Sequence, residues 1–164
     1  MPVRPVLRYP HPALKQPARA LAEGEDPTPA TDDLLDTMRS HQGCVGLAAP
    51  QIDAPVRIVV VDASRHPKAR DANNGLLVLV NPVVVSSEGA EVAREGCLSI
   101  PHLTANVRRA THIEVEARGT SLRSEGFEAR CLLHEIDHLD GLLFLDRVDS
   151  LATDVFRRKR SSGK

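Results

Sequence analysis

The sequence predicts an α+β fold in which mainly antiparallel strands surround a central helix. A chain of 164 residues has the length of one ordinary domain. Short β-branched, apolar runs alternate with turn residues, which is typical of strands in a small mixed fold. One segment in the second half, residues 127–139, repeats apolar residues with helical spacing. We expect a single domain over residues 1–150 and a basic tail over residues 151–164.

The first 30 residues are rich in proline, which interrupts helices and strand ladders, so they predict an irregular arm lying over the body. The prolines are Pro2, Pro5, Pro10, Pro12, Pro17, Pro27 and Pro29. A first helix is expected from Thr31, because acidic residues follow and Leu34, Leu35 and Met38 form an apolar stripe. It should run to about His41 and end near Gly43.

Strands account for most of the middle of the chain. A strand is expected over residues 56–62, followed by a turn-rich loop over 64–75. Residues 76–85 predict a second strand that is broken at Asn81-Pro82. A turn at residues 86–89 then leads into a third strand that begins over 90–94.

The last strand and the central helix follow. Around residues 107–117, Ile113, Val115 and Ala117 alternate with polar residues, which predicts a half-buried strand. Residues 119–126 are interpreted as a polar connection. The helix over 127–139 has Leu132, Ile136 and their neighbours as its apolar stripe, with Gly141 as its stop.

Composition excludes several classes of protein. Hydrophobic residues make up 41% and charged residues 26%, a globular balance, and the formal net charge of -1 argues against a general nucleic-acid binder. We expect no specific DNA partner. No apolar run has the length of a membrane helix or a signal peptide, so the expected location is cytoplasmic, with no membrane contact. Three cysteines indicate reduced thiols rather than a disulfide framework.

The strongest local signal is His134-Glu135-Ile136-Asp137-His138. Two histidines four residues apart on a helix project from the same face and can bind one metal ion. Glu135 can then take a proton from a water at the open coordination position.

Two other segments carry chemistry. The site needs a third protein ligand, and no histidine follows at the spacing used by zinc peptidases. Upstream, Cys97 lies beside a glycine in a polar loop and can present a thiolate to a metal. The segment 43–51 is rich in small residues that allow close backbone approach, and its Gln51 is a neutral donor suited to an oxyanion.

These three segments, in this order, resemble the peptide deformylase family. That family has Gly-x-Gly-Leu-Ala-Ala-x-Gln, then Glu-Gly-Cys-Leu-Ser, then Gln-His-Glu-x-Asp-His-Leu. The corresponding segments here are 43–51, 95–99 and 133–139, and residues 9–14 and 141–146 are also similar. The resemblance covers nearly the whole chain.

The resemblance implies a mononuclear metal site in a catalytic domain over residues 1–150. Its ligands would be Cys97, His134 and His138, with water in the fourth position as the nucleophile. Glu135 would be the general base and then the general acid, while Gln51 and the backbone N–H of Leu98 would stabilise the oxyanion. Gly46 would hydrogen-bond the substrate backbone, and the candidates for the methionine pocket are Val45, Phe127 and Cys131.

The implied reaction is removal of the formyl group from formyl-methionyl nascent peptides, which releases formate. The family commonly uses Fe²⁺, and Zn²⁺, Ni²⁺ or Co²⁺ can occupy the site. A thiolate ligand suits such divalent ions. Glu95 and Arg109 are either an ion pair that orders the cysteine loop or two unrelated charges. The basic run 157–160 is either a solvated helix end or a contact with ribosomal RNA.

Three positions depart from the family pattern. Cys44 stands where the first glycine of the first motif is usual, Leu133 stands where glutamine is usual, and Thr104 lies near the position of a family arginine. The stretch between Cys97 and His134 is also shorter. The alternatives to a deformylase are a zinc peptidase, which would cut unformylated peptides, and a non-enzymatic zinc domain or ribosome-associated module. A module would tolerate loss of Glu135.

Overall fold

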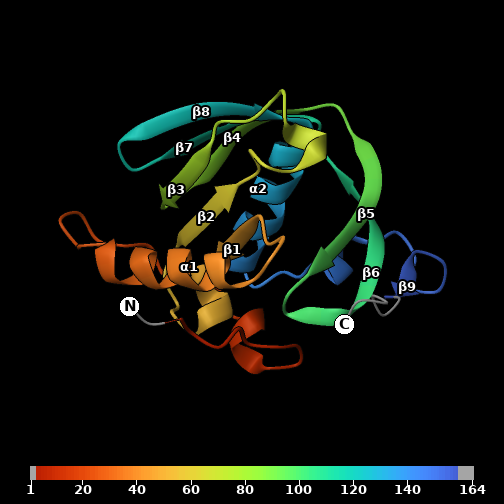
Figure 1. Ribbon diagram of the computed structural model, residues 1–164, viewed down its shortest axis with the longest axis horizontal. Coiled ribbons are helices and arrows are strands. Elements are labelled where there is room, and N and C mark those ends of the chain that lie inside the picture. The colour runs from red at the N-terminus through yellow and green to blue at the C-terminus, as the bar shows by residue number, and fades with distance from the viewer. Residues whose placement is uncertain (1–2, 159–164) are drawn as a thin grey trace.

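The computed structural model describes residues 3–158, in which α2 (Gly126–Leu139) lies at the centre of three small sheets (Figure 1). The first sheet has the order β1 (Gly46–Ala48), β2 (Ile58–Asp62), β3 (Leu76–Val80). The second has the order β4 (Val83–Glu88), β7 (His112–Ala117), β8 (Thr120–Glu125). The third has the order β5 (Glu91–Cys97), β6 (Ile100–Arg109), β9 (Val155–Arg157). All the paired strands are antiparallel, so the predicted fold class is confirmed.

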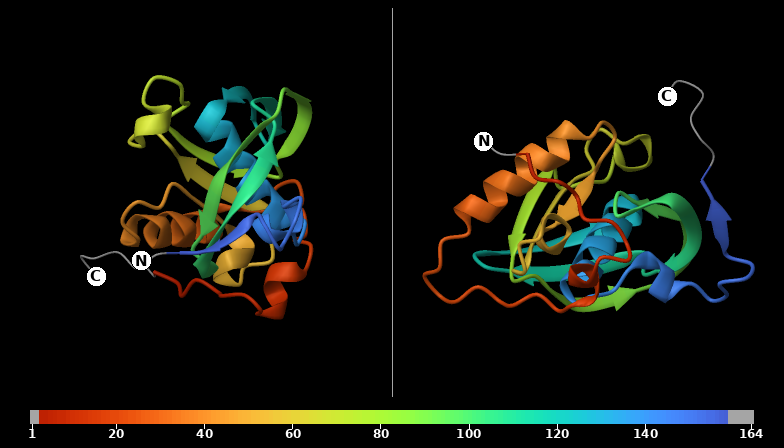
Figure 2. Two further views of the ribbon diagram at one scale, coloured as in Figure 1. Left: turned by 90° about the vertical axis from the view of Figure 1, so that its right-hand side faces the viewer. Right: turned by 90° about the horizontal axis from the view of Figure 1, so that it is seen from below.

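One further α-helix and four 3₁₀ turns complete the described chain. Helix α1 (Thr28–Ser40) packs against the first sheet through Leu34 and Met38, which lie in one cluster with Ile58 and Val60 of β2. The 3₁₀ turns are η1 (Pro12–Lys15), η2 (Ala49–Ile52), η3 (Pro67–Ala69) and η4 (Phe144–Arg147). Figure 2 shows α1 on the outside of the molecule and α2 enclosed by the strands.

Helix α2 is buried nearly all round because apolar residues of the first and second sheets meet it on different sides. Leu132, Ile136 and Leu139 share one core cluster with Val59 of β2 and Val115 of β7. Burial on this scale contributes roughly 25 cal/mol per Å² of apolar surface removed from water. The rigid helix is therefore a suitable support for the polar residues of its middle turns.

The proline-rich arm is tied to the body by backbone hydrogen bonds. The N–H of Leu7 donates to the carbonyl of Gln51 over 2.7 Å, and the N–H of Tyr9 donates to the carbonyl of Ser99 over 2.8 Å. The N–H of Ala18 donates to the carbonyl of Leu139 at the end of α2. The arm thus braces both loops that flank the candidate site.

The expected boundary of the first helix is wrong by one turn. Helix α1 begins at Thr28, not Thr31, and Pro27 is its N-cap. Proline at the first positions of a helix costs no hydrogen bond, so Pro29 is accommodated in the first turn. The prediction of an irregular arm over the first 30 residues is therefore wrong for residues 28–30.

Several expected connections are strands. Residues 119–126, interpreted as a polar connection, contain β8, which pairs with β7 as a hairpin. Ser86 and Ser87, expected in a turn, belong to β4, and the chain reverses around Gly89 with φ of 73°. The strand expected around 107–117 is two strands, β6 and β7. The alternation predicted for residues 113–117 is confirmed, because Ile113 and Val115 are buried between exposed neighbours.

The described part of the basic tail contains a short strand. Residues 155–157 form β9 and pair with Leu103–Ala105 of β6, so this stretch is not a helix end and it extends the sheet beyond residue 150. Lys159, Arg160 and Lys164 lie outside the described residues.

Asn81, in the connection between β3 and β4, ties the arm to the sheets. It has a φ of 53°, and its side chain exchanges two hydrogen bonds with the backbone of Leu21, at 2.9 and 3.0 Å. Asn81→Ala should lower the free energy of unfolding by about 1–3 kcal/mol, through strain and unpaired backbone groups. Urea unfolding measures this change. Asn81→Gly loses the same two hydrogen bonds but adopts the positive φ without strain, so its stability should fall between those of Asn81→Ala and the wild type. Equal stability of Asn81→Ala and the wild type would contradict the prediction.

Candidate metal centre

Helix α2 and the end of β5 place three ligand atoms together. His134 and His138 lie one turn apart on α2, and Cys97 ends β5 just after an irregular step in its pairing with β6. One atom from each residue lies within 4.8 Å of the others, and all three residues are buried. The Sγ of Cys97 is 3.5 Å from Nε2 of His138. A soft thiolate and two imidazoles around one point form a donor set for a divalent transition metal.

Burial keeps the imidazole of His138 in the neutral form that can bind a metal. Burial lowers the pKa of His138 well below its usual range, which favours the neutral ring that a metal requires. Its Nδ1 is buried and has no hydrogen-bond partner among the described residues.

Glu95 orients the other imidazole. Its Oε1 lies 2.9 Å from Nδ1 of His134, so Nε2 of that ring remains free to face the cluster. Burial alone would raise the pKa of Glu95, but hydrogen bonds from His134 and Arg109 lower it to about 2. The carboxylate is therefore a permanent acceptor.

Arg109 links Glu95 to Asp137 of α2. It donates from Nε and Nη2 to the two oxygens of Glu95, at 2.9 and 3.0 Å, and from Nη1 to Asp137 at 2.6 Å. The Glu95–Arg109 ion pair, one of the two alternatives left open by the sequence, is therefore present. It belongs to a larger network of charged side chains. Arg130 also donates to Glu95, and Arg147 donates twice to Asp137. This buried network fixes β5, β6 and α2 around the cluster.

Glu135 lies next to the cluster with a free oxygen. It is 6% exposed, and its Oε1 has no hydrogen-bond partner in residues 3–158. Burial raises the pKa of Glu135 to about 7, a value suited to both taking and returning a proton. Gly46 allows this arrangement, because a Cβ there would lie 2.9 Å from Oε2 of Glu135.

One cavity of about 270 Å³ opens onto these groups. Of the ten residues selected from the sequence, nine line it: Val45, Gly46, Gln51, Cys97, Leu98, Phe127, Cys131, His134 and Glu135. His138 lies behind them and is 1% exposed. Gln51 accepts from the N–H of Ala48 and donates to Ser99 at 3.0 Å and toward Cys97 at 3.5 Å. Its amide is therefore held in one orientation beside the cluster.

The two departures near the cluster have simple local roles. The thiol of Cys44 donates to the carbonyl of Gly46 over 3.2 Å, and burial raises the pKa of this thiol to about 12. It is therefore a hydrogen-bonding thiol on the cavity wall rather than a nucleophile. Leu133 packs against the apolar cluster around α2.

The sequence interpretation missed several residues of this region. Arg130 has no local motif, because its partners Glu95 and Val107 are distant in the chain. His66 stacks on Phe127, one of the residues that line the cavity, with ring centroids 4.0 Å apart. Arg94 and Arg158 line the opening of the cavity. None of these contacts has a periodic signal in the sequence.

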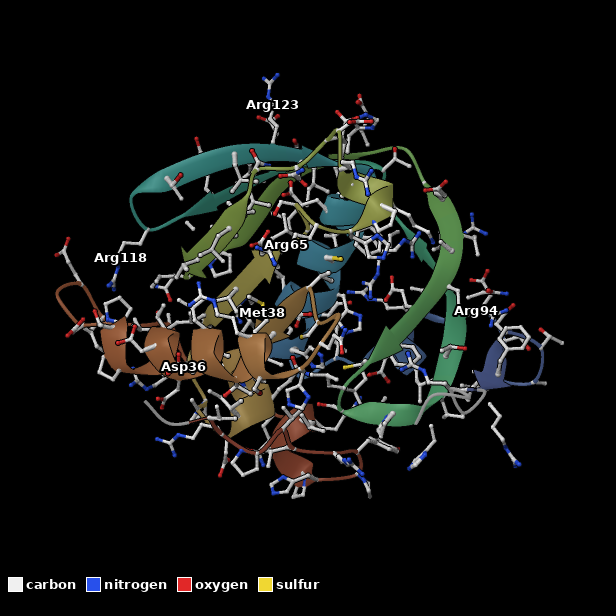
Figure 3. The ribbon with its side chains drawn as sticks, viewed as in Figure 1. Asp36, Met38, Arg65, Arg94, Arg118 and Arg123 are labelled. Carbon is white, nitrogen blue, oxygen red and sulfur yellow. The ribbon has the colours of Figure 1, made fainter. Side chains whose placement is uncertain are left out.

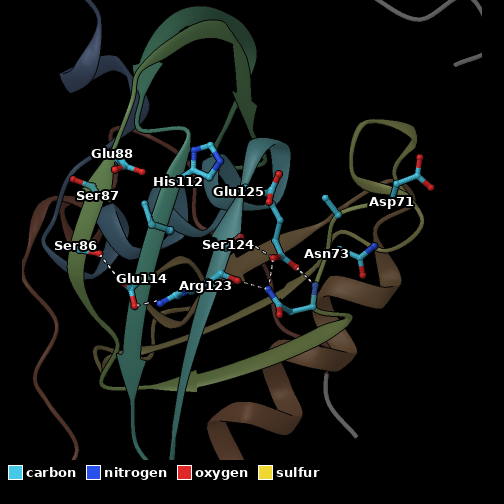
Figure 4. A pocket seen from close by; sticks show the side chains of 14 residues that line it. Asp71, Asn73, Ser86, Ser87, Glu88, His112, Glu114, Arg123, Ser124 and Glu125 are labelled. Carbon is cyan, nitrogen blue, oxygen red and sulfur yellow. Dashed lines mark hydrogen bonds and ion pairs between the residues drawn. The ribbon is translucent and has the colours of Figure 1, made fainter.

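A larger cavity of about 710 Å³ lies elsewhere, between the second sheet and the loop that follows η3 (Figure 4). Its most buried carboxylate, Glu128, accepts hydrogen bonds from Asn74 and Ser124 at 2.6 and 2.7 Å. This carboxylate therefore anchors the loop to α2. None of the three clustered ligands lines this cavity.

Comparison with known proteins identifies the family. The family model for polypeptide deformylase matches residues 3–154. The chain belongs to the peptide deformylase family. A peptide deformylase of Thermodesulfovibrio yellowstonii is 36% identical over 170 residues, covering 100% of both chains. The crystal structure of a peptide deformylase from Legionella pneumophila is 36% identical, with a TM-score of 0.80, covering 92% of this chain and 88% of that one.

Peptide deformylases remove the formyl group from N-formyl-methionine peptides, so this chain is an enzyme of that activity. The family is metal-dependent, which agrees with the clustered ligands. The family membership therefore favours a deformylase over the peptidase and the non-enzymatic alternatives. A related structure from Acinetobacter baumannii is described as bound to Met-Ala-Ser. It has a TM-score of 0.80 and 31% identity, covering 90% of this chain and 99% of that one. Within residues 3–158, no helix is both long enough and apolar enough to cross a membrane.

Proposed function

We propose that Cys97, His134 and His138 bind one divalent cation and that Glu135 moves the protons of deformylation. The observation that carries this proposal is the juxtaposition of three buried ligand atoms within 4.8 Å with a buried carboxylate that has a free oxygen. The bound cation supplies Lewis acidity, which activates a water and polarises the formyl carbonyl. We propose Fe²⁺ as the native ion, with Zn²⁺, Ni²⁺ or Co²⁺ as substitutes.

Each proposed protein group has one task. Glu135 accepts a proton from the attacking water and donates it to the departing amine, so that water and formyl amide become formate and a free N-terminus. Gln51 and the N–H of Leu98 stabilise the negative charge that develops on the formyl oxygen. Gly46 binds the peptide backbone. Val45, Phe127 and Cys131 form an apolar pocket for the methionine side chain.

The related structure described as bound to Met-Ala-Ser supports the binding of a methionyl peptide by this chain. The amino end of the peptide would lie at the cluster, and the later residues would leave through the opening. We propose that the enzyme works in the cytoplasm. A ribosome contact through the basic residues 157–160 stays a prediction, and salt-sensitive cosedimentation with ribosomes would test it.

The direct test is formate release from formyl-Met-Ala-Ala by protein prepared without oxygen and loaded with Fe²⁺ or Ni²⁺. We expect turnover that stops on chelation and returns on adding metal. Unformylated Met-Ala-Ala is the control, and it should remain intact. Absence of formate release with one metal bound per chain would overturn the proposal.

A further inference from the structure

Two arginines stand at the opening of the catalytic cavity. Arg94 of β5 and Arg158, which follows β9, are exposed and line the same cavity as Cys97 and Glu135. The carboxylates that line it, Glu95 and Glu135, are buried deep inside. Gln42 and Gly43, the other two exposed residues of the lining, are uncharged. The exposed part of the lining therefore carries positive charge and no negative charge.

The pairing of β9 with β6 places Arg158 at the opening of the cavity. Its N–H donates to the carbonyl of His102 over 2.8 Å, which continues the pairing beyond Arg157. Its guanidinium lies directly against Gly96, where a Cβ would collide with Nη2. The glycine beside the metal ligand thus leaves room for the arginine.

Arg94 and Phe156 hold β9 in place. The guanidinium carbon of Arg94 lies 3.8 Å from the centroid of the Phe156 ring, and Arg94 also donates to Asn106 and Thr104. Figure 3 shows Arg94 on the outer side of β5, next to β9. Within the described chain, neither Arg94 nor Arg158 has a carboxylate partner within 4.0 Å. Thr104, near the position of the missing family arginine, accepts a hydrogen bond from Arg94 and lies close to Gly96, as the Arg158 guanidinium does.

The substrate must pass this rim. A cavity of about 270 Å³ is at the small end for ligand pockets, so it encloses the first residues of a peptide while the rest emerges. An unpaired guanidinium there can bind a carboxylate with two parallel hydrogen bonds.

We infer that Arg158, supported by Arg94, is a specificity-determining residue that binds carboxylates of the substrate after its methionine. The inference rests on the proposed function, which puts the formyl group at the cluster. The carboxylate is either an acidic side chain or the free end of a short peptide. In a nascent chain only the side chain is available, so the enzyme should favour formyl-methionyl chains with an early Asp or Glu.

The test uses C-terminally amidated formyl-Met peptides of five residues. A single Glu, Gln or Lys is placed at the second, third or fourth position, and the other positions are alanine. We expect kcat/KM to be about threefold to fivefold higher for Glu than for Gln at one of these positions, an effect typical of an exposed ion pair. The gain should lie in KM, with kcat unchanged, and it should shrink at high salt. Comparison of kcat/KM between the unamidated and the amidated all-alanine peptide measures the contribution of the free carboxyl end.

Variants assign the effect to the side chain. Arg158→Gln should remove the preference for Glu, and Arg158→Lys should retain part of it. The neighbouring Arg157→Gln is the matched control, because Arg157 is exposed but lies outside the cavity lining. This control should keep the preference.

If the wild type turns over every peptide without preferring Glu, the inference is overturned while the proposed function stands. A preference for Glu that survives in Arg158→Gln overturns the inference as well. Failure of the wild type on all formylated peptides would instead overturn the proposed function.

Discussion

Glu135→Gln is expected to lower kcat for formate release by about 10²–10⁴-fold, because the amide cannot accept the proton of the attacking water. The metal should remain bound, since the three clustered ligands are unchanged. Stability should not fall. Glu135 is buried with one unpartnered oxygen, so replacing the carboxyl by a neutral amide removes a desolvation cost.

Three measurements check this result together: formate release, metal content per chain and the unfolding midpoint. Glu125→Gln is the matched control, because Glu125 is exposed at the start of the same helix and makes no capping hydrogen bond there. It should retain wild-type activity. A Glu135→Gln enzyme with full metal and near-normal kcat would show that another group moves the protons.

Arg109→Met should cost about 3–5 kcal/mol of unfolding free energy, because it leaves Glu95 and Asp137 buried without their shared partner. Arg109 is 6% exposed, so water cannot replace the lost hydrogen bonds. Activity should also fall in any protein that still folds, because Glu95 would no longer be held against His134.

Arg108→Met is the control for this variant. Arg108 precedes Arg109 in the same strand, but its one ion pair within residues 3–158, with Asp149, is 3.5 Å long and exposed on both sides. Its loss should cost less than about 1 kcal/mol. Denaturant unfolding of both variants gives the comparison, and similar losses for the two arginines would refute a special role for the buried network.

Local spacing was enough to predict the ligands on α2. His134 and His138 are four residues apart on a helix, so their relative placement follows from helical geometry alone. The alternation of Ile113 and Val115 likewise predicted the half-buried β7. Cys97, Gln51 and Gly46 came from motifs in their own short loops, and the structure places them in the cavity beside the histidines.

The strands that were missed have a common feature: each forms because a partner strand offers it hydrogen-bonding groups, and not because of a periodic pattern of its own. Strand β8 has the polar sequence Thr-Ser-Leu-Arg-Ser-Glu, and it forms a strand because β7 offers a complete row of hydrogen-bonding groups. Strand β9 is only three residues long and depends on β6, about 50 residues earlier in the sequence.

The sequence by itself therefore determined the class of fold, the family and the residues proposed for the site, because these depend on residue type and on spacing within single elements. The tertiary structure alone decided how those groups are held and what surrounds them. The Glu95–Arg109–Asp137 network joins two strands and a helix, and Arg158 reaches the cavity only because β9 pairs with β6. Contacts between distant segments have no period along a chain, so they emerge only when the chain is folded.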